Sequence, residues 1–271
     1  MRMKPLLSYR RAKLRRAAPA VLLCALLQSA AFAGNTGLWV GSAVVDQVNQ
    51  PAIAPGTLMP AAKSFPYRLI LHVDTNNTTR LLQRVVAVLT PTGGLVTNAV
   101  TGVVITNGTT VLLSDESLVP AQLQTYPNAT VRRISSVNFL LMAPQVMNGQ
   151  FGSTGQLTCT LQVPYDDPVS PFVHAYAPLH DNLQVQNGVT TKLPEGVESF
   201  SVTRNLTLVF SAQDPVTPGN PNWGISEIGG TLQEVLGGLY QPLFNGAAQS
   251  IQVSGSFRLQ KVSDNGTLIM P

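Results

Sequence analysis

The chain has 271 residues, of which 44% are hydrophobic and only 11% are charged, with a formal net charge of +4. A disordered tail or a coiled coil would carry far more charge, so the composition indicates a folded protein with a sizeable core. Seven of the 17 Lys and Arg residues lie in residues 1–16, which contain no acid. The rest of the chain is mildly acidic, which excludes nucleic acid as a partner, because binding it needs a basic face.

Residues 1–33 have the organisation of a secretory signal peptide. A cationic stretch precedes a short apolar run at 19–27, and Ala31-Phe32-Ala33 forms an A-x-A cleavage site before Gly34. The apolar run is shorter than the roughly 20 residues that cross a bilayer, and no later run is longer. We therefore predict cleavage after Ala33 and export to the periplasm or the extracellular space. The mature chain, residues 34–271, is expected to have no membrane span.

Cysteine usage points to a core that is stabilised by burial alone. Cys24 is removed with the leader, so Cys159 is the one thiol of the mature chain and an intrachain disulfide is impossible. Cys159 alternates with Leu157 and Leu161 and has no charged neighbour that would lower the pKa of its thiol. We expect a buried structural thiol.

The mature chain is rich in Val and Thr and has many segments of period-two alternation, both typical of strands. No convincing helix of 12 or more residues accompanies them, which argues against a parallel α/β sheet. We predict an all-β fold, an antiparallel β-sandwich or barrel of one domain or two packed halves. About ten strands are expected, at residues 38–48, 68–73, 80–89, 95–105, 109–113, 130–142, 150–163, 200–210, 229–236 and 251–260.

Three connections interrupt this pattern. Residues 74–79 are polar and predict a hairpin turn, because Asn and Asp tolerate a positive φ. The proline-rich residues 50–66 are expected to form a connecting loop. Residues 164–196 form a longer proline-rich loop, and its length makes it a candidate for function.

The long loop concentrates groups that bind metals or transfer protons. Imidazole with carboxylate binds zinc, and several carboxylates with an amide bind calcium. A divalent metal is thus one prediction for this loop, and acid/base catalysis is another; the alternative is a structural role in which Asx side chains cap turns. The metal candidates are Asp166, Asp167, His174, His180 and Asp181. Tyr165, Tyr176 and Asn182 are candidate ligand-binding residues.

Other signals of function are weaker. The chain has no Gly-x-Ser-x-Gly elbow, no phosphate-binding glycine loop and no HExxH pair, so no residue is predicted to be catalytic. Trp39 and Trp223 suit either core packing, which we favour, or stacking on a carbohydrate partner.

Several motifs are spread along the mature chain: GLWVG at 37–41, RLILHVD at 68–74, YDDPxxPFVH at 165–174, HDN at 180–182 and GSFRL at 255–259. Together they resemble an uncharacterised family of exported bacterial proteins. The resemblance implies export and a β-rich fold, and no established activity. In that family the loop often reads Tyr-His-Pro-Asp-His-Asp-Asn, whereas this chain has Ala177 and Leu179 in place of the first His and the first Asp.

These observations favour a non-catalytic binding or structural module of the cell envelope or extracellular space. The alternative is a metal-dependent or acid/base hydrolase that uses the loop from Asp166 to Asn182. A third hypothesis is a self-assembling surface protein, for which exposed strand edges would be the sign. The sequence does not identify a cofactor. A carbohydrate and a component of the cell envelope are both possible partners.

Overall fold

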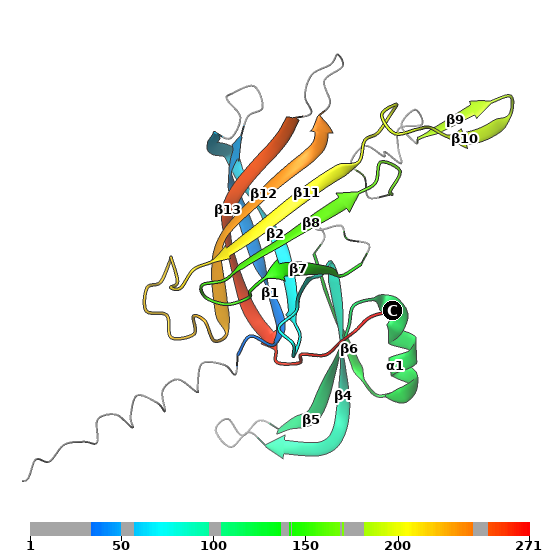
Figure 1. Ribbon diagram of the computed structural model, residues 1–271. Coiled ribbons are helices and arrows are strands. Elements are labelled where there is room, and N and C mark those ends of the chain that lie inside the picture. The colour runs from blue at the N-terminus through cyan, green and yellow to red at the C-terminus, as the bar shows by residue number, and fades with distance from the viewer. Residues whose placement is uncertain are drawn as a thin grey trace, which may run out of the picture. The chain divides into compact units, whose positions relative to one another are not determined.

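The computed structural model describes residues 34–49, 57–97, 104–136, 141, 143–168, 170, 182–240 and 249–271. These residues are almost entirely β structure, which confirms the all-β prediction. Eight strands close into a barrel, four strands form a second sheet, and two strands form a separate hairpin (Figure 1). The predicted leader lies outside the described residues.

The barrel is antiparallel throughout, and its strands neighbour one another in chain order. Two long insertions interrupt this up-and-down order, residues 82–144 and residues 164–201. The last strand pairs with the first and closes the sheet. The barrel strands are β1 (Gly37–Asn49), β2 (Leu58–Val73), β3 (Thr79–Leu81), β7 (Gln145–Gly149), β8 (Gln156–Val163), β11 (Val202–Phe210), β12 (Glu227–Tyr240) and β13 (Gln249–Ser263).

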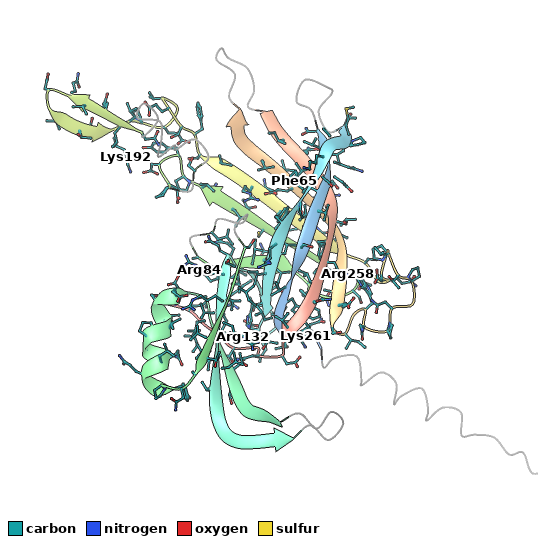
Figure 2. All side chains as sticks on the ribbon, turned by 180° about the vertical axis from the view of Figure 1, so that it is seen from behind. Phe65, Arg84, Arg132, Lys192, Arg258 and Lys261 are labelled. Carbon is teal, nitrogen blue, oxygen red and sulfur yellow. The ribbon has the colours of Figure 1, made fainter. Side chains whose placement is uncertain are left out.

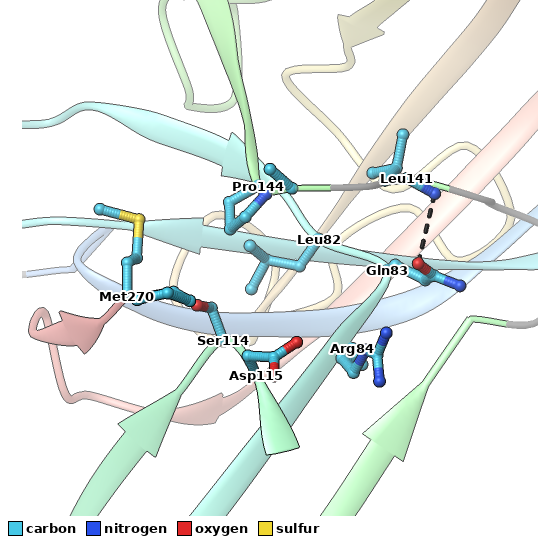
Figure 3. Close-up of a pocket in the computed structure, with 10 residues that line it drawn as sticks. Leu82, Gln83, Arg84, Ser114, Asp115, Leu141, Pro144 and Met270 are labelled. Carbon is cyan, nitrogen blue, oxygen red and sulfur yellow. Dashed lines mark hydrogen bonds between the residues drawn. The ribbon is translucent and has the colours of Figure 1, made fainter. Parts of the chain in front are cut away.

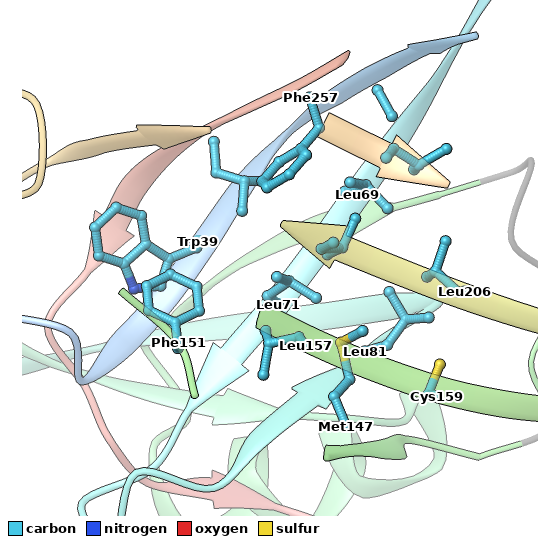
Figure 4. Close-up of a cluster of buried hydrophobic side chains, with 14 of the residues drawn as sticks. Trp39, Leu69, Leu71, Leu81, Met147, Phe151, Leu157, Cys159, Leu206 and Phe257 are labelled. Atoms are coloured by element: carbon cyan, nitrogen blue, oxygen red, sulfur yellow. The ribbon is translucent and has the colours of Figure 1, made fainter. Parts of the chain in front are cut away.

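Alternate residues of these strands form one hydrophobic core. Leu69 and Leu71 on β2, Leu157 on β8 and Leu206 on β11 are all essentially inaccessible to solvent (Figure 4). Cys159 belongs to the same cluster, as the alternation predicted. An eight-stranded barrel has an interior just wide enough for side chains to fill, so this core replaces a channel.

Aromatic rings close the core near the β7–β8 and β11–β12 connections. The ring centroids of Trp39 and Phe151 are 5.1 Å apart, those of Phe151 and Phe210 are 5.0 Å apart, and those of Phe210 and Phe257 are 5.3 Å apart. Such tilted and edge-on contacts suit the quadrupoles of the rings. Trp39 is fully buried, which confirms the core role favoured for it and leaves no face for a carbohydrate.

Glycines on the barrel strands permit close backbone approach. A Cβ atom on Gly230 would lie 1.9 Å from the carbonyl oxygen of Val209, and one on Gly255 would lie 1.9 Å from that of Val44. Any side chain there would push neighbouring strands apart. These glycines therefore allow the sheet to curve tightly enough to close.

Strands β4, β5 and β6 of the first insertion, together with β14, which follows β13, form a second sheet in the order β14-β5-β4-β6. In this sheet β14 pairs parallel with β5 and the other pairs are antiparallel. Its Leu82, Val85 and Leu112 pack with Leu38 and Ile70 of β1 and β2 in a second core. In a third core, Val119, the first residue of a short helix, packs with Val86, Val88 and Leu113. The elements are β4 (Arg84–Thr97), β5 (Val104–Leu113), β6 (Thr130–Ser135), β14 (Leu268–Ile269), the 3-10 turn η1 (Glu116–Leu118) and α1 (Val119–Thr125).

The structure corrects the loop predicted over residues 50–66, because β2 already begins at Leu58. Pro60 pairs with Gln47 of β1, and Pro66 pairs with Val44. The edge of β2 that faces away from β1 pairs with β3 only at residues 71–73. The prolines, which have no N–H, therefore interrupt no backbone hydrogen bonds along that edge. Phe65, labelled in Figure 2, lies in this part of β2 and is half exposed.

Two Asn-Gly dipeptides, which favour tight turns, lie on strands instead. Asn107-Gly108 lies within β5 and Asn148-Gly149 lies at the end of β7. In the second case the turn follows one residue later, since Gln150 donates its N–H to the carbonyl of Gln156. Local turn propensity was outweighed at both sites by pairing with a neighbouring strand. The turn predicted at 74–79 is confirmed, with Asn77 at φ 62°.

The predicted long loop is also partly wrong, because it contains a hairpin of β9 (Leu183–Gln186) and β10 (Val189–Lys192). The strands are joined by Asn187 and Gly188, both at positive φ, as a two-residue hairpin turn requires. Among the described residues, no helix is long and apolar enough to cross a bilayer.

The barrel core predicts a matched pair of stability effects. Leu157→Ala removes a fully buried side chain of β8, so it should lower the free energy of unfolding by about 3 kcal/mol in urea denaturation. Val146→Ala, on β7 but 53% exposed, should change it by less than about 0.5 kcal/mol. Equal effects of the two changes would contradict the assignment of the barrel interior as the main core.

Candidate functional site

The predicted metal loop is only partly within the described residues. His174, His180, Asp181 and Tyr176 lie outside them. Asp166 forms a salt bridge with Lys192 of β10, and this hydrogen bond lowers the pKa of the carboxyl group. Asp167 donates its N–H to the carbonyl of Pro164, 3.1 Å away, in a turn. In the part of the chain that is described, no three His, Cys, Asp or Glu side chains are grouped to hold a metal, and the predicted site stays a prediction.

The structure does bring Tyr165 and Asn182 together, through hydrogen bonds. The Asn182 side-chain N–H donates to the carbonyl of Tyr165 at 3.0 Å. The Ser199 hydroxyl lies 2.7 Å from two acceptors that share its proton, the Tyr165 carbonyl oxygen and the Asn182 Oδ1. The backbone N–H of Asn182 donates to Glu198, and Asn182 is buried at φ 59°. These contacts fasten the base of the β9–β10 hairpin, which is a structural role for two residues predicted to bind a ligand.

A pocket of about 360 Å³ lies where the chain leaves the barrel for the second sheet (Figure 3). Four segments meet there: the β3–β4 link, the end of β5, the approach to β7 and the residues after β14. Its walls are mostly apolar, with Leu82 and Leu141 buried. The lining residues are Leu82, Gln83, Arg84, Ser114, Asp115, Leu141, Ala143, Pro144, Met270 and Pro271.

Ser114 is the buried polar residue of this pocket, with a relative exposure of 6%. Its backbone N–H donates to the carbonyl of Ile269 at 2.9 Å, which fixes the backbone beside β14. Its hydroxyl oxygen has no hydrogen-bond partner among the described residues. A buried hydroxyl without a partner loses its bonds to water and gains none, so it is costly to the fold.

The other polar groups of the pocket differ in how far they are engaged. Asp115 accepts the backbone N–H of Ser117 at 2.9 Å and caps η1, and the hydrogen bonds from Ser117 lower the pKa of its carboxyl group. Gln83 accepts the N–H of Leu141 at 3.3 Å. The hydrogen bonds from Arg133 lower the pKa of the neighbouring Glu116, and the charge of Arg84 adds a smaller effect on Glu116 and Asp115. Within the described residues, no carboxylate lies within ion-pair distance of the Arg84 guanidinium.

The lining combines an apolar surface with a few polar groups, as small-molecule sites do. It contains apolar walls, one cationic group and one unpartnered hydroxyl, and none of its ten described residues is a His, Cys or Lys that would activate a nucleophile. Sequence reasoning missed the pocket, because its residues come from four separate segments. Its one local signal, the polar Gln83-Arg84 after Leu81-Leu82, lay inside a predicted strand.

A second polar cluster lies within the barrel. Arg204 of β11 and Glu234 of β12 form an ion pair, with 2.5 Å between Nε and Oε1, and their side chains are 19% and 5% exposed. Burial and then the Glu234 charge raise the pKa of Tyr67, and the same causes raise the pKa of Cys159 to about 11. The Cys159 thiol is therefore protonated and unreactive at neutral pH, as expected for a structural thiol.

A third network fastens the β11–β12 connection. Asp214 accepts hydrogen bonds from the backbone N–H groups of Val216 and Thr217 and from the side chains of Asn220 and Arg258, at 2.9 to 3.1 Å. The Asn220 bond is the largest of the causes that lower the pKa of Asp214 to about 2. Glu227 also accepts from Asn220 and Arg258.

Trp223, a candidate for carbohydrate stacking, lies against that network. Its ring nitrogen donates to the carbonyl of Ser211 at 2.9 Å, and the Arg258 guanidinium lies 5.5 Å from its ring centroid. The indole therefore has a structural role at the end of the barrel.

Comparisons with known proteins add no identification. No family model matches the chain, and no curated protein matches it. The resemblance to an exported bacterial family therefore remains a prediction from the motifs.

The buried ion pair predicts non-additive effects on stability. Glu234→Leu leaves the Arg204 guanidinium enclosed without its carboxylate, so the free energy of unfolding should fall by about 3 kcal/mol. The double variant Arg204→Leu with Glu234→Leu removes both charges and should recover much of that loss in urea denaturation. Additive losses in the double variant would show that the two side chains do not depend on each other.

The Asp214 network predicts acid sensitivity. Because the pKa of Asp214 is about 2 in the folded protein and 3.8 ordinarily, the unfolded chain binds its proton first as the pH falls. The stabilisation is complete above pH 4 to 5 and is lost as the pH falls towards about 2. Thermal unfolding of Asp214→Asn from pH 6 to 2 should show a weaker pH dependence than the original protein. Asp46→Asn, at an exposed strand position, is the control and should keep the original dependence.

Proposed function

We propose that this protein is an exported, non-catalytic binding module that holds a small amphipathic molecule in the pocket between its barrel and its second sheet. The observation that carries the proposal is the hydroxyl of Ser114, which is buried at the pocket wall and lacks a partner among the described residues. A ligand with a hydrogen-bonding group would supply that partner. An unsatisfied buried group in a folded protein calls for an explanation, and a bound water, ion or ligand is one.

The chemistry of the walls defines the class of ligand. Leu82, Leu141, Pro144 and Met270 offer an apolar surface, and a volume of about 360 Å³ is within the range of small-molecule sites. The guanidinium of Arg84 adds a cation, while Asp115 is engaged in capping η1. A compact apolar body with one anionic or hydrogen-bond-accepting group would satisfy both Arg84 and Ser114.

The cellular setting is proposed from the leader. A cationic stretch, an apolar run and an A-x-A site precede Gly34, which supports export to the periplasm or beyond. A small-molecule binding module fits the absence of catalytic motifs in the sequence. Within the envelope or the extracellular space, the protein would capture its ligand from solution.

Two fluorescent probes with one aromatic body test this proposal. The anionic 8-anilinonaphthalene-1-sulfonate should bind with one-to-one stoichiometry, and the uncharged N-phenyl-1-naphthylamine should bind more weakly. Arg84→Gln should weaken binding of the anionic probe about tenfold, since it removes a charge-assisted hydrogen bond, and should barely change binding of the neutral one. Ala143→Phe should weaken both by filling the pocket. Val146→Phe adds the same ring outside the lining and is the matched control.

Ser114→Ala separates binding from folding. It should weaken probe binding and leave the free energy of unfolding unchanged or slightly raised, because the hydroxyl has no partner to lose. A Ser114→Ala protein that unfolds more readily, or an Ala143→Phe protein that binds both probes normally, would refute the proposal.

A further inference from the structure

We propose that His72 is a proton-sensitive latch for the C-terminal segment, residues 264–271, and that a fall in pH opens this segment and speeds the release of ligand from the pocket. The latch is inferred from the contacts of His72 and needs no ligand. Its effect on ligand release rests on the proposed function, because Met270 and Pro271 of this segment line the pocket.

His72 is a fully buried histidine on the outer face of the barrel. It lies on β2 opposite Leu38 of β1 and Arg80 of β3, and its relative exposure is 0%. Leu38 and Ile70, which share this face of the sheet, belong to the core that the second sheet forms with the barrel. The imidazole therefore lies where the second sheet packs on the barrel, away from water.

The hydrogen bonds of the ring fix its neutral form. Nε2 lies 3.1 Å from the backbone carbonyl oxygen of Asn265, and a carbonyl only accepts, so Nε2 carries the proton. Nδ1 is then the basic nitrogen, and it is buried without a hydrogen-bond partner among the described residues. A second proton at Nδ1 would place a charge without an acceptor inside the fold. The closed segment therefore favours neutral His72.

The charged groups near His72 do not compensate for such a proton. Arg80, its partner on β3, is itself cationic, and Asp74 is already engaged by Arg80 at 2.8 Å and by two backbone N–H groups. Asp264, the acid of the segment, pairs with Lys261, and its side chain is 90% exposed. β5 and the part of β1 opposite His72 contain no charged residue.

These surroundings couple the proton of His72 to the position of the segment. Burial lowers the pKa of His72 below its ordinary value of 6.5; the charge of Arg80 adds to this effect, and the Asn265 bond and Asp74 oppose it. In an open segment the ring would meet water and regain its ordinary pKa. The open form therefore binds the proton first as the pH falls, so acid favours opening below about pH 6.5.

The segment runs from the end of β13 to the second sheet (Figure 1). Besides the bond from His72, the Asn265 side-chain amide donates to the carbonyl of Thr110 at 2.5 Å, and the N–H of Ser114 donates to the carbonyl of Ile269 at 2.9 Å. β14 pairs two residues with β5, and both remain partly exposed where they pack. β1 and β2, on the other side of His72, are paired over most of their length. The segment is therefore the part of this junction that can open.

Opening of the segment would remove one wall of the pocket. Met270 and Pro271 follow β14 directly and line the pocket together with Ser114, whose N–H bonds to Ile269 (Figure 3). A ligand would leave where these two residues withdraw, so its rate of release would follow the fraction of open molecules. Protonation of His72 would thus speed release.

Amide hydrogen exchange, measured by NMR at about pH 7.5 and about pH 5.5, tests the latch without any ligand. The lower pH is one unit below 6.5, so the open fraction should rise between about threefold and about tenfold. The protection factor of the Ser114 N–H, which loses its acceptor when the segment opens, should fall by the same factor.

His72→Gln retains a neutral side-chain N–H for Asn265 and has no titratable ring, so its protection factor should be the same at both pH values. His72→Asn, which is also neutral and keeps a side-chain N–H, is the second test variant should the first fail to fold. Asp264→Asn changes an exposed acid of the same segment and is the matched control, which should respond to pH like the original protein. Circular dichroism confirms that each variant is folded.

The latch is overturned if the Ser114 N–H of the original protein is equally protected at both pH values, or if the folded His72 variants lose protection as the original does. Stopped-flow release of 8-anilinonaphthalene-1-sulfonate tests the link to the pocket, and release should be faster at the lower pH by a similar factor. A probe that binds but leaves at the same rate at both pH values overturns that link. Absence of probe binding would refute the proposed function, while amide exchange still decides the latch.

Discussion

Closure of an eight-stranded sheet is the constraint on which the rest of this structure depends. Once β13 pairs with β1, every barrel strand has one face inside, and whatever lies on that face must pack or find a partner. The aliphatic and aromatic residues of the inner face pack together, and Arg204 pairs with Glu234. Gly230 and Gly255 make the closure possible, because the backbone of a neighbouring strand occupies the space of a side chain.

The pocket is a consequence of the way the chain leaves the barrel. Leu81 is the last residue of β3, and by Arg84 the chain has entered another sheet. The second sheet packs its apolar face on Leu38 and Ile70, outside the barrel, and the segments that enter and leave it do not fill the junction completely. Ser114 lies at that junction, where its backbone N–H bonds to the carbonyl of Ile269 and its buried hydroxyl has no hydrogen-bond partner among the described residues. Incomplete packing at the junction thus leaves a cavity that is lined by apolar side chains and a few polar groups.

Closure also explains why edges matter elsewhere in the molecule. Among the described residues, strand edges remain unpaired where β2 runs beyond its short contact with β3, and at the ends of the two smaller sheets. On the β6 edge of the second sheet Arg132 is exposed and Arg133 forms a salt bridge with Glu116, whereas the β9–β10 hairpin is exposed along its whole length. The two insertions therefore have different consequences: one packs against the barrel and contributes to a pocket, and the other carries an exposed hairpin.

The sequence by itself determined the all-β class, most strand positions, the turn at 74–79 and the burial of Cys159 and Trp39, because alternation and turn chemistry act between neighbouring residues. The choice of a barrel, the strand character of residues 58–66 and the pairing of Arg204 with Glu234 were decided by tertiary structure. So was the pocket, whose groups come from four segments of the chain. The metal loop was the most conspicuous local signal, yet Tyr165 and Asn182 hold a hairpin in place and Asp166 is paired with Lys192. Local composition reports which groups are near one another along the chain, and only the closed sheet determines which of them meet in space.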